Sequence, residues 1–261
     1  MGEYDSSRTR VTPIFTRLLC DDPTGKSWIP TLLGLPESGS RTPAIPPAAE
    51  LAEARWWPSE KRLAPPPSLL RWLVRNVKAP RRESDWGTGE TREKRTALVR
   101  HEPEAIEEAL RRLSRPRDEV AEKDWAVLEG PSQPDVFLAT QDTVIVAEGK
   151  RTESGPTIGT TWFPERHQML RHLDAAWEMR GGRRLFGFFI VEALPGTIEV
   201  PKDWVRFAAE TNSTAVLDAS LPHRTAEERQ RIGESFLGVT TWQAVCSVFH
   251  IPKEVLICKV T

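Results

Sequence analysis

Two short apolar segments joined by a two-residue turn constrain the fold of this chain more than any other feature. Residues 135–140 and 143–150 each have the composition of a β-strand, and Gln141-Asp142 is short enough to join them as an antiparallel hairpin. Side chains alternate between the two faces of a strand, so Glu148 and Lys150 emerge on the side of the apolar residues Val144 and Val146. Charged groups at the end of an otherwise buried strand are costly unless they are paired or used.

The first of these strands begins with Pro134-Asp135. In an antiparallel hairpin the start of one strand lies beside the end of the other, so we expect Asp135 to approach Glu148. Two carboxylates and Lys150 would then converge on one point. Carboxylate oxygens are the ligands that Mg²⁺ prefers, and a lysine beside them can stabilise a hydroxide or a phosphate oxygen.

Length and composition exclude several classes of protein. The chain has 261 residues, enough to bury a sizeable core, and its three cysteines, Cys20, Cys246 and Cys258, are too scattered for a disulfide framework or a zinc site. No apolar run approaches the roughly 20 residues of a membrane span, and the charged N-terminal residues do not resemble a signal peptide. We therefore expect a cytoplasmic protein without a membrane partner.

Charge is distributed unevenly along the chain. The formal net charge of -1 argues against a surface that binds polyanions everywhere. Basic residues nevertheless outnumber acidic ones over 71–100, whereas 102–129 is acid-rich. A basic segment that precedes an acidic centre suits a protein that holds phosphates with one part and metal with the other. A solvated loop followed by an ordinary charged helix would give the same pattern.

Residues 1–100 are rich in proline and tryptophan. The prolines interrupt any long periodic element, whereas the tryptophans have to pack on something, so we expect an ordered extension that packs on the core. Apolar spacing predicts a short helix over 68–77 within it. The turn-forming residues at 84–89 predict a mobile loop.

The pattern becomes more regular from residue 101. A core domain over 101–195 is predicted to contain, in order, a helix at 103–113, a strand at 125–129, the two hairpin strands, a helix at 163–179 and a buried strand at 185–191. Residues 196–261 are predicted to be a helical extension of the same domain. Its expected elements are helices near 203–210, 226–236 and 241–249 and a final strand at 255–260.

This element order, with Pro-Asp at the start of one strand and Glu-x-Lys at the end of the next, resembles the PD-(D/E)xK nuclease superfamily, the restriction-endonuclease-like fold. The resemblance covers roughly His101 to Glu192. It implies an α/β protein with a mixed sheet and an αβββαβ core. It further implies hydrolysis of phosphodiester bonds in nucleic acid, with DNA as the expected substrate and Mg²⁺ or Mn²⁺ as the cofactor. A homodimer would suit cleavage of both strands of a duplex.

Transferred to this sequence, the resemblance makes Asp135 and Glu148 metal ligands and makes Lys150 the residue that orients or activates the attacking water. It also implies an acidic ligand from the first helix of the core, for which Glu107 and Glu102 are candidates. Glu129 is another candidate metal ligand, because alternation over 125–129 places it on the same strand face as Trp125 and Val127. Exposed carboxylates on a helix or at a turn are the alternative reading of these glutamates.

The second long helix often supplies a glutamine or a basic residue to the site in this superfamily. Gln168 is the catalytic candidate here, and Arg171, three residues on, can share its helix face. Both could instead simply flank the buried stripe. His167 and His172 are assigned to the helix surface, because no serine or cysteine nucleophile motif accompanies them.

Two functions of different kinds follow from these patterns. The first is a metal-dependent nuclease that uses Asp135, Glu148, Lys150 and Gln168. The second is a catalytically inactive module that keeps the scaffold and binds nucleic acid or a protein partner. An α/β domain of another activity, which binds metal only incidentally, is a third reading. The glycine pairs at 87–89 and 181–182 lack the spacing of a phosphate-binding loop, so nucleotide-dependent chemistry is not indicated.

Overall fold

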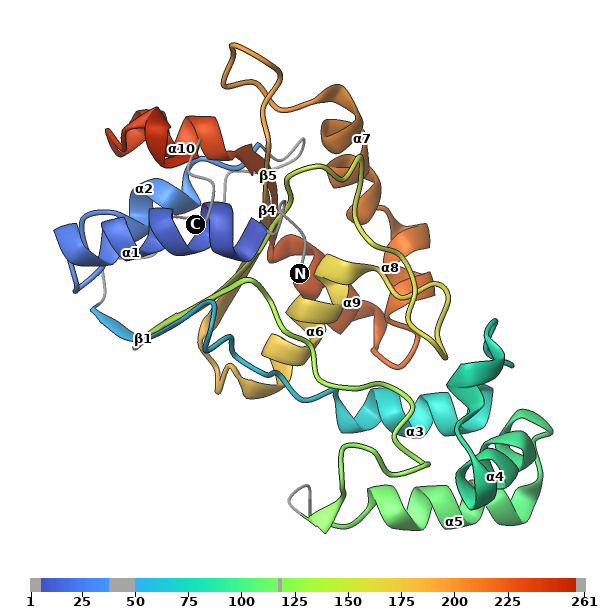
Figure 1. Ribbon diagram of the computed structural model, residues 1–261. Coiled ribbons are helices and arrows are strands. Elements are labelled where there is room, and N and C mark those ends of the chain that lie inside the picture. The colour runs from blue at the N-terminus through green and yellow to red at the C-terminus, as the bar shows by residue number, and fades with distance from the viewer. Residues whose placement is uncertain (1–5, 38–49, 117–118, 257–261) are drawn as a thin grey trace.

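A five-stranded mixed sheet organises the chain in the computed structural model, which describes residues 6–37, 50–116 and 119–256 (Figure 1). The strands lie side by side in chain order, with β2 antiparallel to both its neighbours and β3, β4 and β5 parallel to one another. The predicted α/β class with a mixed sheet is therefore confirmed. The strands are β1 (Leu51–Arg55), β2 (Val136–Thr140), β3 (Thr143–Gly149), β4 (Arg184–Val191) and β5 (Phe236–Thr241).

The predicted hairpin is formed by β2 and β3. Val136 lies opposite Ala147 in their register, so the next pair outward is Asp135 and Glu148. Phe137 and Val146 belong to the buried cluster on one face of the sheet, and Leu138 and Ile145 belong to the cluster on the other face. Because both faces are covered, the strands are apolar almost throughout, as a central sheet requires.

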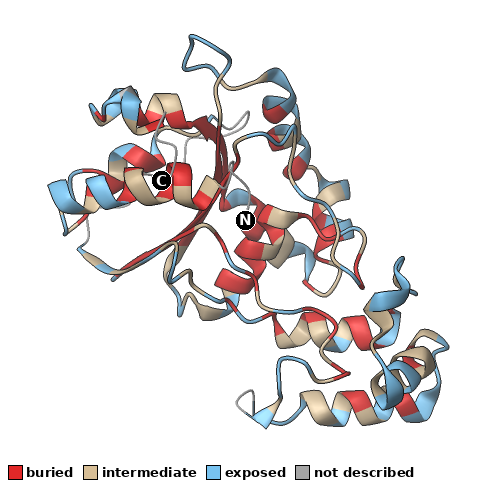
Figure 2. Ribbon diagram, in the orientation of Figure 1, coloured by how far each residue is buried: buried red, intermediate tan, exposed pale blue. Residues whose placement is uncertain are grey.

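Helices cover both faces of the sheet, and buried residues concentrate between the layers (Figure 2). Phe15, Trp28 and Trp242 pack on one face together with Ile145 and Phe188. The elements on that side are η1 (Ser7–Val11), α1 (Thr12–Asp21), α2 (Ile29–Leu33) and α10 (Trp242–Val248). The other face carries α6 (Gln168–Met179), α7 (Lys202–Thr211), α8 (Thr214–Ser220) and α9 (Ala226–Glu234).

A smaller helical group lies at one end of the sheet and is inserted between β1 and β2 (Figure 1). It has its own buried cluster, to which Leu69, Leu98 and Ala109 contribute. The helices predicted at 68–77 and 103–113 are confirmed. The loop expected at 84–89 is wrong in part, because η2 and the start of α4 occupy it. The group consists of α3 (Pro67–Asn76), η2 (Glu83–Trp86), α4 (Gly89–Val99) and α5 (Pro103–Leu113).

The strand predicted at 125–129 is wrong. These residues form turns, and Trp125, Ala126 and Leu128 pack in the core of the helical group. A short apolar alternation shows only that one side is buried, not that the burial is against another strand. The third antiparallel strand is instead β1, which comes from the segment predicted to be an extension.

The C-terminal half differs from the predicted elements at several boundaries. Helix α6 begins at Gln168 rather than near residue 163, since Pro164 and its neighbours form turns. The helix predicted over 226–236 ends at Glu234 and gives way to β5, whose apolar residues pair with β4. Helices near 203–210 and 241–249 are confirmed as α7 and α10, whereas α8 was not predicted. Of the strand expected at 255–260, residues 257–260 lie outside the described residues, and the preceding residues form η4 (Lys253–Leu256).

Across the part of the chain that the structure describes, every helix is too short or too polar to cross a membrane.

Candidate active site

The structure brings Asp135, Glu148 and Lys150 together where β2 begins and β3 ends. The backbone N–H of Gly149 donates to Asp135 Oδ2 at 2.8 Å, which ties the aspartate to the neighbouring strand. Lys150 Nζ lies 3.1 Å from Glu148 Oε1. The charges of both Glu148 and Lys150 act on the Asp135 carboxyl. The three side chains therefore form one electrostatic cluster, which we call the strand-end cluster.

The backbone around Lys150 is held on both sides. Its N–H donates to Ile190 O of β4 at 2.8 Å, and its carbonyl accepts from Trp242 Nε1 at 3.1 Å. A side chain at Gly149 would not fit, because a Cβ there would lie 2.7 Å from the Trp242 ring and 3.2 Å from Asp135 Oδ2. Glycine therefore allows the close approach that places Asp135 beside Glu148.

The two acids of the strand-end cluster have different protonation behaviour. Burial, followed by the charge of Glu148, raises the pKa of Asp135 to about 7, although hydrogen bonds from Ser7 and Gly149 act in the opposite direction. Burial would also raise the pKa of Glu148, but its contacts with His172 and Lys150 outweigh this effect and hold the pKa below its usual value. Near neutral pH, Glu148 is therefore ionised while Asp135 carries a proton part of the time.

Helix α6 supplies two further contacts to Glu148 from its first turns. Gln168 Nε2 donates to Glu148 Oε1 at 2.7 Å. His172 Nε2 lies 3.1 Å from Glu148 Oε2, and the other ring nitrogen, Nδ1, lies 2.7 Å from Ser132 Oγ. Residues 168 and 172 are four apart, so they share the helix face that meets β3. The structure thus places the predicted Gln168 at the cluster and adds His172 to it.

The surface positions expected for His167 and His172 are wrong, because both side chains are buried. Burial, with a smaller contribution from His172, lowers the pKa of His167 to about 4, and its Nε2 lies 3.2 Å from Thr211 Oγ1. Helical spacing from the apolar residues of α6 could have placed His172 on the inner face. The absence of a nucleophile motif says nothing about burial, which depends on the helix face that a residue occupies.

The N-terminal segment contacts the strand-end cluster from the other side. Ser7 Oγ donates to Asp135 Oδ1 at 2.6 Å, and Ser6 Oγ donates to Gly149 O at 3.0 Å. Arg10, in the same π-helical turn, pairs with Glu192 at 3.0 Å. Nothing in the sequence indicated these contacts, which join residues more than a hundred positions apart.

The structure does not bring the other three candidate metal ligands to the cluster. Glu102 is exposed at the start of α5. Glu107 is exposed on α5, which packs on α3 and α4 rather than on the sheet. Glu129 is buried, but its carboxylate is paired with the Arg166 guanidinium at 3.2 Å, and Arg171 lies 3.7 Å away. These expectations depended on the helix at 103–113 and the residues at 125–129 being part of the sheet layers, which they are not.

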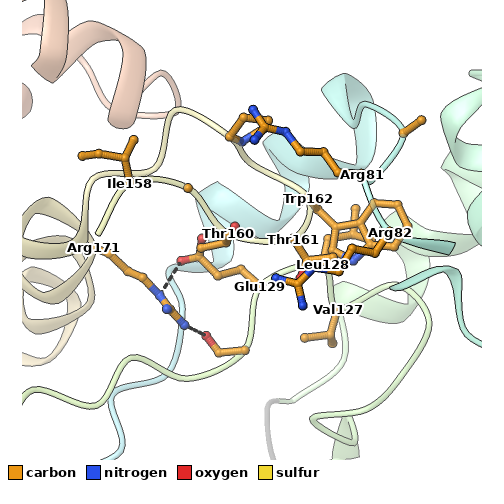
Figure 3. A pocket seen from close by; sticks show the side chains of 14 residues that line it. Arg81, Arg82, Val127, Leu128, Glu129, Ile158, Thr160, Thr161, Trp162 and Arg171 are labelled. Carbon is orange, nitrogen blue, oxygen red and sulfur yellow. Dashed lines mark hydrogen bonds and ion pairs between the residues drawn. The ribbon is translucent and has the colours of Figure 1, made fainter. Parts of the chain in front are cut away.

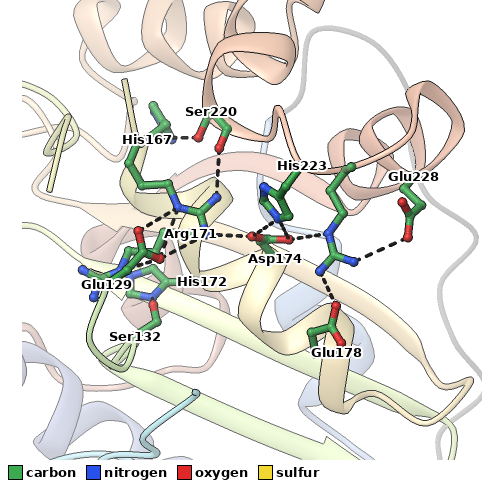
Figure 4. A network of polar contacts seen from close by, with 12 residues as sticks. Glu129, Ser132, His167, Arg171, His172, Asp174, Glu178, Ser220, His223 and Glu228 are labelled. Atoms are coloured by element: carbon green, nitrogen blue, oxygen red, sulfur yellow. Dashed lines mark hydrogen bonds and ion pairs between the residues drawn. The ribbon is translucent and has the colours of Figure 1, made fainter. Parts of the chain in front are cut away.

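Glu129 belongs instead to a buried ionic network that spans α6 and the segment after α8 (Figure 4). Arg166 bridges Glu129 and Asp174, with a 2.7 Å contact to Asp174 Oδ2. Asp174 also pairs with His223 at 3.1 Å and with Arg224 at 2.8 Å. Burial opposes ionisation here, but the contacts with Arg166, His223 and Arg224 hold the pKa of Asp174 well below its usual range.

Asp135 and Glu148 are the oxygen donors that the cluster could offer to a cation. Among the residues that the structure describes, no group of three or more His, Cys, Asp or Glu side chains is arranged to hold a metal ion. Mg²⁺, however, is commonly held by one or two carboxylates, with waters and substrate oxygens as its other ligands. Glu148 Oε2 is buried and makes no well-aligned hydrogen bond, which leaves it able to accept a ligand bond. The donor pair therefore fits such an ion.

A cleft of about 610 Å³ lies between the helical group and the helices on the sheet (Figure 3). Arg81 and Arg82 line it from the segment after α3, and residues 158–162 line it from the loop that follows β3. Arg171 of α6 forms part of the same wall as Glu129. The cleft and the strand-end cluster thus share both α6 and the loop that begins at Lys150.

A scan against protein-family models, a search of the curated proteins and a search of the solved structures each found no match to this chain. The chemistry of the strand-end cluster therefore carries the functional inference.

Proposed function

We propose that this protein is a metal-dependent nuclease that hydrolyses phosphodiester bonds in nucleic acid, with DNA as the expected substrate. The observation that carries the proposal is the convergence of Asp135, Glu148 and Lys150 at adjoining strand ends, with the pKa of Asp135 raised to about 7. Buried acids with shifted pKa values concentrate at sites that bind cations or move protons.

The element order supports the proposed relationship to the PD-(D/E)xK superfamily, although with other elements than those predicted. With α2, which lies between α1 and β1, set aside as an addition, the order α1, β1, β2, β3, α6 and β4 follows the helix, three strands, helix, strand order of that superfamily. Helix α1 and strand β1 stand where residues 103–113 and 125–129 were expected. The helices α3 to α5 are then an insertion between the first two strands of this core.

Asp135 and Glu148 would hold the Mg²⁺ or Mn²⁺ ion. When bound, the ion would neutralise phosphoryl oxygens and lower the pKa of a coordinated water. The same positive charge would offset the repulsion between the two carboxylates, so Asp135 would bind as the ionised form. The Gly149 N–H keeps one Asp135 oxygen oriented towards the end of β3.

The remaining residues of the cluster would position Glu148 and stabilise charge. Lys150, held by Glu148 at 3.1 Å, would place its ammonium group beside the attacking water or the phosphoryl oxygens. A preorganised cation of this kind stabilises the transition state more than the ground state. Gln168 fixes Glu148 Oε1 from α6, and Ser132 holds the His172 ring, which lies beside Oε2.

The direct test is cleavage of single-stranded and double-stranded DNA and RNA with Mg²⁺ or Mn²⁺ and with EDTA. Asp135→Asn and Lys150→Met should each reduce the cleavage rate by about 100-fold or more. The exposed-site variants Asp203→Asn and Lys26→Met make the same chemical changes and should retain activity. Cleavage that survives EDTA, or that survives both cluster variants, would contradict the proposed nuclease.

A catalytically inactive module is the second candidate, and the contacts of Ser7 favour it. Its hydroxyl occupies Asp135 Oδ1 at 2.6 Å, so the carboxylate already has a neutral partner within the chain. Binding of nucleic acid without cleavage under any metal condition would support this function over the first. A homodimer, expected for cleavage of both strands, can be tested by light scattering on the purified protein.

A further inference from the structure

We infer that the cleft beside the strand-end cluster binds a single strand of nucleic acid, with Arg81 and Arg82 as its principal phosphate contacts. The chemical class of this ligand rests on the proposed function, but the inference concerns binding and not cleavage.

The first observation is the free positive charge at the cleft. Residues 71–82 contain five basic side chains and no acidic one, and Arg81 and Arg82 are exposed. Over the described ranges, no carboxylate forms an ion pair with either of these two arginines, whereas Lys78 pairs with Glu165 at 3.3 Å. Planar guanidinium groups without a protein partner suit bidentate binding of phosphate oxygens.

Arg171 has a different role at the same cleft. Its Nη2 donates to the carbonyls of Gly130 and Pro131 at 3.0 and 2.9 Å. Its Nε lies 3.7 Å from Glu129 (Figure 3). These contacts hold the guanidinium against the wall. The exposed positive charge available to a ligand therefore comes from Arg81 and Arg82 on the segment after α3.

The lining also suits a nucleobase. Val127 and Leu128 supply apolar surface, and Thr160 and Thr161 supply hydroxyl groups. Trp162 also lines the cleft, but it is only 6% exposed, because Trp86 packs on it edge-on at 5.8 Å and the Arg95 guanidinium lies 5.3 Å from its ring centroid. Apolar and polar lining beside positive charge suits an unpaired strand, whose bases and phosphates are both accessible.

The volume favours one strand over two. A cleft of about 610 Å³ is in the range that accommodates a small-molecule-sized group, such as one or two nucleotides. The paired bases of a duplex are stacked inside the helix and would have to be extruded before they could enter. Unpaired nucleotides do not incur that cost, so a single strand should bind more tightly than a duplex of the same sequence.

The position of the cleft connects this strand to the proposed chemistry. The loop that lines it at 158–162 begins directly after Lys150, and Arg171 lies one helical turn beyond Gln168, whose amide contacts Glu148. Asp135, Glu148 and Lys150 are not part of the cleft lining, so α6 and this loop are what connect the cleft to the strand-end cluster.

The test is fluorescence anisotropy with a labelled oligonucleotide, as a single strand and as a duplex, in EDTA so that no metal-dependent cleavage occurs. The double variant Arg81→Ala/Arg82→Ala should bind the single strand about tenfold or more weakly. The slope of log affinity against log salt should become less negative by about 1.4, since two phosphate contacts are lost. Wild type should prefer the single strand.

A matched control separates a local contact from a general effect of charge. Arg206→Ala/Arg231→Ala removes the same charge from exposed positions on α7 and α9 and should bind nearly as wild type does. Equal losses in the two double variants, equal affinity for the duplex, or competition by a mononucleotide at the concentration of the oligonucleotide would each overturn the inference.

Binding measured in EDTA and cleavage measured with metal test the cleft and the proposed nuclease separately. Asp135→Asn should bind the single strand at least as well as wild type in EDTA, because it removes only negative charge. If binding depends on Arg81 and Arg82 but no metal supports cleavage, the proposed nuclease activity is contradicted and single-strand binding in the cleft is supported. If cleavage depends on Asp135 while Arg81→Ala/Arg82→Ala leaves binding unchanged, the nuclease activity is supported and single-strand binding in the cleft is contradicted.

Discussion

Two buried charged clusters meet α6, and they differ in how their negative charge is balanced. Asp174 is fully buried, pairs with Arg166 and Arg224 and contacts His223, and these three partners hold its pKa well below the usual range. Asp135 has a neutral hydroxyl and a backbone N–H as its hydrogen-bond partners, and its pKa is raised to about 7. Two side chains of the same type, Asp174 and Asp135, therefore lie in electrostatic environments that shift their pKa values in opposite directions.

The difference shows what distinguishes a structural acid from a candidate functional one. The acids of the Asp174 network are matched by cations that belong to the fold, so the network is complete without a ligand. In the strand-end cluster, Lys150 is the cation beside both Asp135 and Glu148, it lies 3.9 Å from Glu153 as well, and the mutual repulsion of Asp135 and Glu148 remains. Burial alone does not identify a site, whereas burial with unbalanced charge does.

Among the variants of the two clusters, Asp174→Asn should change the free energy of unfolding the most. The variant would leave Arg166 and Arg224 buried beside an uncharged amide, so the free energy of unfolding should fall by about 3–5 kcal/mol. Urea denaturation would measure it, with the exposed Asp218→Asn as the matched control. A loss below about 1 kcal/mol would show that the network is not what stabilises this part of the molecule.

Asp135→Asn should have the opposite effect on the free energy of unfolding and stabilise the protein. At pH 8 in EDTA, Asp135→Asn removes an ionised carboxylate whose burial beside Glu148 is unfavourable, so the free energy of unfolding should rise by about 1–2 kcal/mol. Metal-dependent cleavage should be lost in the same variant. Destabilisation comparable to that of Asp174→Asn would mean that the two clusters are alike, and the comparison would fail.

The stability of wild type and of Asp135→Asn should depend differently on pH. The pKa of Asp135 is raised from 3.8 to about 7, so between these values the folded state holds a proton that the unfolded state has released. The free energy of unfolding of wild type should therefore fall relative to Asp135→Asn as pH rises from about 4 to about 7, and the difference should be flat above that range. Urea titrations of both proteins across this interval would measure it. Mg²⁺ should reduce the slope, and an unchanged slope at saturating Mg²⁺ would argue against binding at Asp135.

The smallest effect is expected for Gln168→Ala. It removes one hydrogen bond to Glu148, worth about 1 kcal/mol, so the cleavage rate should fall by tenfold or less with Mg²⁺ dependence retained. Gln230→Ala, which removes a hydrogen bond to Glu234 on the exposed face of α9, should leave the rate unchanged. A loss as large as that of Lys150→Met would assign Gln168 a direct part in the reaction.

Local patterns were enough to predict the hairpin of β2 and β3, the strand β4 and the helices α3, α5, α7 and α10. In each of these elements, apolar spacing and a nearby turn or proline act within a few residues, so the information lies within the segment itself. The pairing of Asp135 with Glu148 followed from the same local geometry, because a tight turn sets the register of the strands it joins.

Tertiary packing decided which segments joined the sheet and which side chains completed the cluster. Residues 125–129 alternate as a strand does, but their apolar side chains pack in the core of the helical group. Strand β1 pairs with β2 in their place. Ser7 and His172 reach the cluster from segments distant in the chain. A segment's sequence specifies that it has a face to bury, whereas the choice of partner depends on competition among all the apolar surfaces of the folded chain.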